Sequence, residues 1–199
     1  MKYLRFLCAL LLAFAVLCPA PAFAKKISKD GASALGDANP VVTSLKSFKV
    51  FNGKPNPKAK FYFYLCSASW CGPCQKEMPV IVKLHKEMKK DGRADIILVG
   101  YDKTLDAAKA YLKSHKAKFA GIWEGDKHIK ELPGYGPVPG IPYVIMVDRS
   151  GKTLTVQHAS MLENWKTAVD NAEAQEKPSA EEQESPADDT SSDMGDETL

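Results

Sequence analysis

Two short apolar runs in the middle of the chain are separated by a stretch with helical spacing. The runs "KFYFYLC" (60–66) and "ADIILVG" (94–100) consist almost entirely of apolar residues, which is typical of buried strands. Through residues 71–90, apolar side chains recur every three or four positions, and Gly92 supplies an end signal. The pattern therefore predicts a strand, a helix and a second strand in this order.

The same alternation continues along the rest of the chain. A short strand is expected before the central unit, at "SFKVF" (47–51). The segments expected after it are a helix at 104–116 capped by Thr104, a short strand "KFAGIW" (118–123), a hairpin of "YVIMVD" (143–148) and "KTLTVQ" (152–157), and a helix "MLENWKTAVDNA" (161–172). Alternating strands and helices predict an α/β sandwich, with a mixed central β-sheet flanked by helices.

The first 24 residues have the order of a secretory signal peptide. Lys2 and Arg5 precede an apolar run from Phe6 to Leu17, and Ala22-Phe23-Ala24 has the small residues of a cleavage site. The run is well short of the roughly 20 residues that span a bilayer, although a retained membrane anchor is the alternative. We therefore expect an exported protein with no stable membrane span after cleavage, located in the bacterial periplasm.

Composition changes again near the other end. Residues 173–199 carry ten acidic side chains, one lysine and few apolar residues, so a disordered acidic tail is predicted. Residues 25–40 are polar and are expected to form a flexible lead-in, which leaves 41–172 as one domain. With +3 on the whole chain, −9 on the tail and +2 on the signal peptide, residues 25–172 carry +10. The lysines are spread without clustered aromatic residues, so nucleic acid is not expected as a partner.

Cys71 and Cys74 lie where the first buried strand passes into the following helix. In an exported protein a structural disulfide is the default, but a bridge around two residues restricts the unfolded chain little. A zinc site would need further ligands, and the four histidines are far apart in sequence. At the start of a helix, free backbone N–H groups and the helix dipole stabilise a thiolate. Spacing and position therefore favour a reactive dithiol in which Cys71 attacks and Cys74 resolves, with no metal ion or cofactor.

The sequence around this pair resembles the active-site segment of the thioredoxin superfamily. "SASWCGPCQKEMPVIVKLH" is similar to the exported thiol-disulfide oxidoreductases of the TlpA/ResA type and to tryparedoxin-like proteins, with a match from Lys60 to about Ala172. Trp70 precedes the first cysteine and Pro79 follows the second by five residues, as in these enzymes. "GIPYVIMVDRSGK" resembles the later signature of the superfamily, which would make Ile141-Pro142 a cis peptide bond. The resemblance implies a thioredoxin-like sandwich.

The resemblance also implies roles for individual residues. Cys71 and Cys74 would form the redox disulfide. Glu77 stands where TlpA/ResA-type enzymes have a glutamate and could relay a proton to Cys74, although a solvated charge on the helix surface is an equal alternative. The substrate would dock on residues that surround the sulfur: Trp70, Gly72, Pro73, Ile141 and Pro142. Leu65 replaces the buried aspartate of thioredoxin, and Cys66 is expected to be a small buried hydrophobic residue.

The Gly-Pro dipeptide between the cysteines is that of strongly reducing thioredoxins, so the resemblance implies a protein-disulfide reductase. Its substrates would be disulfide-containing exported proteins, with apocytochrome c as one candidate, and electrons would come from a DsbD- or CcdA-like membrane donor. Two alternatives stay open. One is a disulfide oxidase or isomerase on the same fold, and the other is a non-enzymatic thioredoxin-like protein that binds copper or a partner. Related copper chaperones use CxxxC with a distant histidine, a spacing from which this chain departs.

Overall fold

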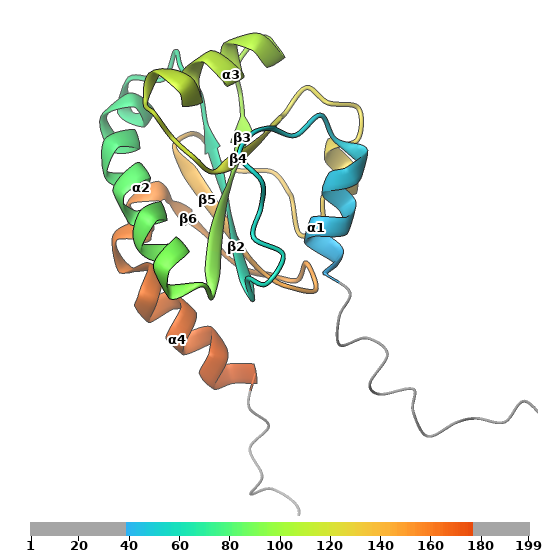
Figure 1. Cartoon of the computed structure of the whole chain (residues 1–199), viewed down its shortest axis with the longest axis vertical. Coiled ribbons are helices and arrows are strands. Elements are labelled where there is room, and N and C mark those ends of the chain that lie inside the picture. Colours follow the sequence, from blue (N-terminus) through green and yellow to red (C-terminus); the bar gives the residue numbers. More distant parts are fainter. Residues whose placement is uncertain (1–38, 177–199) are drawn as a thin grey trace, which may run out of the picture. The chain divides into compact units, whose positions relative to one another are not determined.

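The computed structural model describes residues 39–176 of the chain (Figure 1). The predicted signal peptide and most of the predicted lead-in and acidic tail lie outside the described residues. Within this range, none of the helices combines the length and the apolar character that crossing a membrane requires.

Six strands form one mixed sheet, in the order β1-β4-β3-β2-β5-β6. The strands are β1 (Phe51–Asn52), β2 (Phe61–Ser67), β3 (Ala94–Gly100), β4 (Ala120–Trp123), β5 (Tyr143–Asp148) and β6 (Thr153–His158). Strands β2, β3 and β4 run parallel, whereas β1, β5 and β6 are antiparallel to their neighbours. The predicted mixed α/β sandwich is therefore confirmed.

The longer helices cover one face of the sheet. Helix α2 (Gly72–Asp91) connects β2 to β3, and α3 (Leu105–Ser114) connects β3 to β4. Because crossovers between parallel strands are right-handed and both step in the same direction across the sheet, both helices lie on the same face. Helix α4 (Trp165–Glu176) follows the 3-10 turn η4 (Ala159–Asn164) and packs on this face as well (Figure 1).

The other face is covered by shorter elements. Helix α1 (Pro40–Ser44) and the 3-10 turns η2 (Leu45–Ser47) and η3 (Ile129–Glu131) pack there (Figure 1). In β2, Phe61, Phe63 and Leu65 join the core beneath α2, whereas Tyr62, Tyr64 and Cys66 join the core on the opposite face. Because side chains alternate along a strand and both faces are covered, every residue of β2 is buried.

Helix α2 has the ends that the sequence predicts. Cys71 is its N-cap, and Gly92 ends it in the left-handed conformation, with φ of 86°. Pro73 occupies the first turn, where its missing N–H has no partner to lose, and Pro79 lies further along on the exposed side. The helix therefore begins directly at the cysteine pair.

The structure corrects the prediction near the amino-terminal end of the domain. Most of 47–51 is not a strand, because Phe48 packs into the core on the face of the sheet that α1 covers. Only Phe51 reaches the sheet, where it pairs with Gly121. The domain also begins before residue 41. The buried Asn39 caps α1 through Val42 N, at 3.1 Å, and donates to Tyr62 Oη at 2.6 Å.

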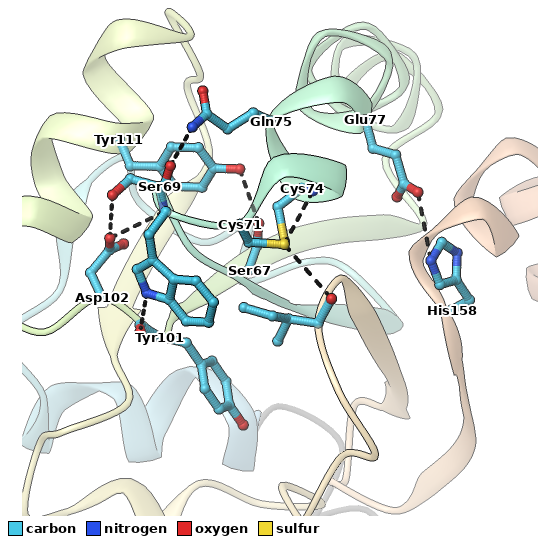
Figure 2. The surroundings of a disulfide bond; sticks show 12 residues. Ser67, Ser69, Cys71, Cys74, Gln75, Glu77, Tyr101, Asp102, Tyr111 and His158 are labelled. Carbon is cyan, nitrogen blue, oxygen red and sulfur yellow. Dashed lines mark hydrogen bonds and ion pairs between the residues drawn. A yellow bond between two sulfur atoms is a disulfide. The ribbon is translucent and has the colours of Figure 1, made fainter.

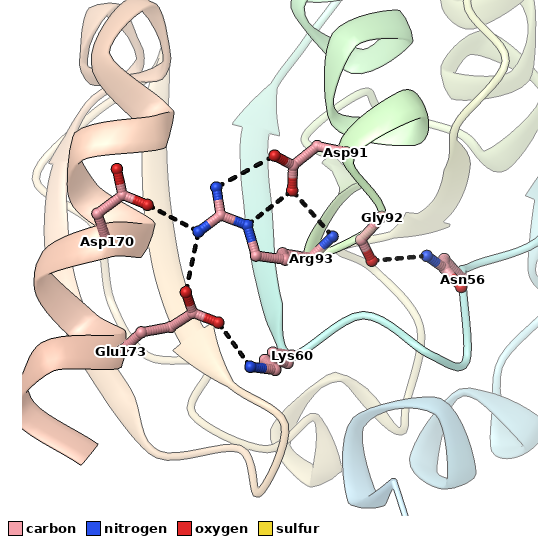
Figure 3. A network of polar contacts seen from close by, with 7 residues as sticks. All are labelled: Asn56, Lys60, Asp91, Gly92, Arg93, Asp170 and Glu173. Atoms are coloured by element: carbon pink, nitrogen blue, oxygen red, sulfur yellow. Dashed lines mark hydrogen bonds and ion pairs between the residues drawn. The ribbon is translucent and has the colours of Figure 1, made fainter. Parts of the chain in front are cut away.

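The predicted tail begins too early, because residues 173–176 form the last turn of α4. Glu173 accepts hydrogen bonds from Lys60 Nζ, at 2.6 Å, and from Arg93 Nη1, at 2.9 Å (Figure 3). Arg93 also contacts Asp170 at 2.7 Å and Asp91 at 2.8 Å. These pairs, which the acidic composition alone does not reveal, connect the last turn of the helix to the start of β2 and the end of α2.

Candidate active site

Cys71 and Cys74 form a disulfide at the start of α2 (Figure 2). Cys71 Sγ accepts a hydrogen bond from Cys74 N at 3.3 Å, so the sulfur occupies the place of a helix-capping oxygen. Cys71 is 6% exposed and Cys74 only 1%. An incoming group can therefore approach the sulfur of Cys71 more directly than that of Cys74.

The Ile141-Pro142 peptide bond is cis, as the sequence predicts, and it lies beside the disulfide. The carbonyl oxygen of Ile141 is 3.7 Å from Cys71 Sγ. Ile141 also packs against the small cluster that contains both cysteines. Pro142 itself is buried, so its neighbour Ile141 presents the backbone edge to the sulfur.

Trp70 is the most exposed large apolar residue in the described part of the chain, at 63%. Its indole Nε1 donates to the carbonyl oxygen of Tyr101 at 3.1 Å, which fixes the ring next to Cys71 in the loop before α2. Gly72 and Pro73 are exposed as well, and a Cβ at Gly72 would meet no atom within 4 Å. The structure thus brings together the predicted docking residues around Cys71, although Pro142 is covered.

Asp102 holds the loop that precedes the cysteines, a role that the sequence analysis missed. Its Oδ1 accepts from Ser69 N at 3.1 Å and from Ser69 Oγ at 2.5 Å (Figure 2). The Ser69 carbonyl in turn accepts from Gln75 Nε2 of α2. A signal was present, because Asp102 follows the end of β3 and the ends of neighbouring parallel strands meet at one edge of a sheet.

The Asp102 carboxylate is buried, and its Oδ2 has no hydrogen-bond partner among the described residues. Its backbone carbonyl accepts from Trp123 Nε1 at 2.8 Å, which fixes the turn after β3. Next to it, Ser67 Oγ and Tyr111 Oη are 3.0 Å apart, and burial raises the pKa of Tyr111. Buried polar groups therefore support the loop that precedes Cys71 and the turn that follows β3.

Cys66 is buried and free of any disulfide, as expected for a small hydrophobic residue. Burial raises the pKa of its thiol to about 12, so the thiol stays protonated at neutral pH. Across residues 39–176, His, Cys, Asp and Glu side chains form no group of three or more suited to hold a metal ion.

Glu77 lies one turn after Cys74 and is partly buried, with 28% of its side chain exposed. Its Oε1 is 3.7 Å from His158 Nε2, while its buried Oε2 has no hydrogen-bond partner in the described range. Burial raises the pKa of Glu77, the charge of His158 opposes this rise, and Glu163 adds to it. The carboxylate points toward His158 (Figure 2). It is therefore more enclosed than a solvated charge on the helix surface, which was the alternative expected for Glu77.

Comparisons with known proteins find similar sequences. A family described as Thioredoxin-like matches residues 59–153. Thiol-disulfide oxidoreductase ResA from Bacillus cereus is 33% identical over 130 residues, which cover 64% of this chain and 71% of ResA. ResA from Bacillus thuringiensis is 34% identical over 58% of this chain and 64% of its own length. The structure of tryparedoxin II from C. fasciculata has 25% identity, covers 70% of this chain and 95% of its own, and gives a TM-score of 0.49. The identity with ResA from Bacillus cereus, which extends over more than two thirds of that protein, shows that this chain belongs to the thioredoxin-like family of ResA-type thiol-disulfide oxidoreductases.

Proposed function

We propose that this thiol-disulfide oxidoreductase works as a reductase of disulfides in exported proteins. In the reduced enzyme, the Cys71 thiolate attacks one sulfur of a substrate disulfide, and the other substrate sulfur leaves and takes up a proton. The Cys74 thiolate then attacks Cys71 Sγ and releases the second substrate thiol. Two electrons pass to the substrate, and the enzyme ends with the Cys71–Cys74 disulfide.

The observation that carries the exchange chemistry of this proposal is the position of the disulfide at the first turn of α2. Cys71 Sγ receives the backbone N–H of Cys74, and it also lies within the field of the helix N-terminus. Both interactions favour the thiolate form of an attacking cysteine. The greater burial of Cys74 suits the resolving role, because a covered thiol can react with the neighbouring Cys71 but not directly with a disulfide in solution.

The substrate would dock on the surface around Cys71. Trp70, Gly72 and Pro73 offer an exposed apolar rim, and the Ile141 carbonyl offers a backbone edge. We assign Glu77 the transfer of the proton to and from Cys74, since it lies one helical turn further along and burial raises its pKa toward the working range of a general acid or base.

The direction of transfer, the location and the partners follow from sequence features. Gly72-Pro73 is the dipeptide of reducing thioredoxins, and residues 1–24 have the order of an export signal. A reductase in an oxidising compartment needs a supply of electrons, so we propose a DsbD- or CcdA-like membrane donor and a periplasmic location. Disulfide-containing exported proteins, with apocytochrome c as one candidate, are the proposed substrates.

The reduction potential of the dithiol tests the direction. A value near that of thioredoxin, about −270 mV, supports a reductase, whereas a value near that of DsbA, about −120 mV, shows an oxidase instead. Cys74→Ser should accumulate mixed disulfides and Cys71→Ser should abolish insulin reduction. Cys66→Ala is the matched control and should keep full activity. Insulin reduction that survives in both serine variants would contradict the assigned roles.

A further inference from the structure

His158 lies close to Glu77 and is held there by contacts with neighbouring residues. It is the last residue of β6 and pairs with Tyr143, the first residue of β5, whose ring meets the imidazole edge-on at 5.9 Å. The next residue, Ala159, donates its backbone N–H to the Pro142 carbonyl at 3.3 Å. The imidazole is therefore connected to the same cis-proline segment that borders Cys71.

The hydrogen bonds of His158 decide which ring nitrogen carries the proton in the neutral form. Nδ1 accepts from the backbone N–H of Ser160 at 3.3 Å, and it lies 3.1 Å from Ser160 Oγ. A backbone N–H can only donate, so Nδ1 of the neutral imidazole is the acceptor and Nε2 carries the hydrogen. Nε2 points at Glu77 Oε1 over 3.7 Å, which is within ion-pair range but longer than a hydrogen bond (Figure 2).

The groups that face Glu77 come from three further elements. His158 reaches it from the end of β6, Glu163 from η4 and Tyr111 from α3, while Lys76 is its neighbour on α2. Glu163 and burial disfavour the carboxylate, and His158 favours it. His158 is also the more exposed partner, since 48% of its side chain is exposed against 28% for Glu77.

We propose that His158 is a positioning residue that orients the Glu77 carboxylate and favours its ionised form. This inference rests on the proposed proton-transfer role of Glu77.

The test follows the Glu77 carboxyl signal by carbon-13 NMR in the full reduced chain, with Glu77→Gln assigning the signal. His158→Ala should raise the Glu77 titration midpoint by about half a unit, the size expected for a partly exposed pair. His158→Gln keeps an N–H donor without the charge and should fall between. If His158→Ala does not fold, His158→Gln still provides the titration midpoint of Glu77. His128→Ala is the matched control, since His128 pairs with Glu131 at 3.0 Å but has no described contact with Glu77.

The pH profile of disulfide reduction supplies the second readout. His158→Ala should shift the acidic limb of the profile in the same direction as the titration, and in a Glu77→Gln background it should shift nothing. An unchanged Glu77 midpoint in both His158 variants overturns the inference. If Glu77→Gln leaves the profile unchanged, the proposed role of Glu77 fails instead, and the NMR titration still decides whether His158 controls its charge.

Discussion

The carbonyl oxygen of Ile141 lies 3.7 Å from Cys71 Sγ, although 70 positions separate the two residues in sequence. The contact arises because β5, which follows Ile141, pairs with β2, which precedes Cys71. A group that reaches the sulfur therefore also comes close to a backbone carbonyl. Extended segments dock on such edges through main-chain hydrogen bonds, which require no particular side chain.

Replacing Trp70 by alanine should weaken the capture of protein substrates. An exposed aromatic ring beside the reactive sulfur offers a large apolar contact, and removing such a residue typically costs about 1–2 kcal/mol, or roughly 5- to 30-fold in kcat/KM. The loss should be clear with insulin and small with a low-molecular-weight disulfide, because the latter covers little of the ring. Val156→Ala removes another exposed apolar side chain, 41% exposed on β6, and should change neither rate. Equal losses with both substrates would place Trp70 in the chemistry rather than in docking.

Asp102→Ala should destabilise the protein and loosen the active-site loop. The change leaves the Ser69 N–H without its partner, which typically costs about 1–3 kcal/mol in the free energy of unfolding. Urea unfolding measures this loss. Asp106→Ala is the control, because the Asp106 side chain is 90% exposed and pairs only with Lys109, so a change within about 0.5 kcal/mol is expected. A similar result for the two variants would show that the Asp102 contacts contribute no net stability.

The stabilising effect of Arg93 should vanish in acid. Hydrogen bonds from Arg93 lower the pKa of Asp91, and those from Lys60 and Arg93 lower the pKa of Glu173. A carboxyl group whose pKa is lower in the folded state stabilises the fold above its unfolded value, here about 3.9 and 4.3, and this contribution is lost as the pH falls through the folded value. Arg93→Gln should therefore lower the unfolding midpoint at pH 7 and leave it nearly unchanged near pH 2.

Thermal unfolding at both pH values measures this effect, and Lys109→Gln, which removes an exposed pair with Asp106, is the control. Because the side chains around Arg93 are partly exposed, added salt should reduce the difference between wild type and variant at pH 7. A difference that persists at pH 2 would indicate that the packing of Arg93, and not its charge, stabilises α4.

Cys66 should not react with thiol reagents in the folded, reduced protein. Its thiol is fully covered, and with a pKa of about 12 hardly any thiolate is present at pH 8. In the reduced protein, a thiol reagent should therefore modify Cys71 quickly and Cys66 only in denaturant. Cys66→Ala should remove the phase that belongs to Cys66 alone. Fast labelling of Cys66 in the native protein would mean that β2 opens locally.

Much of the fold could be predicted because its signals are local. The run 60–66 and the spacing through 71–90 fix a strand and a helix, and Gly92 marks the end of that helix. The position of Cys71 and Cys74 at the start of this helix was also predicted correctly, because it depends on the same local signals. Local signals were misleading at 47–51, where the alternating pattern suits a strand but Phe48 is used by the core beneath the sheet.

The remaining parts of the site depend on which strands are neighbours. Asp102 reaches Ser69 because β3 lies beside β2, and His158 reaches Glu77 because the end of β6 lies beside the start of β5. Neither residue belongs to a sequence motif. Their partners are 33 and 81 positions away, and only the order of the strands brings such residues together.

The disulfide and the salt bridges of Arg93 lie at opposite ends of helix α2. Its 20 residues span about 30 Å, with the disulfide at the first turn and the Arg93 cluster just beyond the last. Because Arg93 binds Asp170 and Glu173, the final turn of α4 is held at the end remote from the sulfur. A fluorophore or an electrode tether attached at Glu176, by chemistry that does not react with thiols, would therefore leave the reactive face open to large substrates, which makes this position suitable for recording turnover on single immobilised molecules.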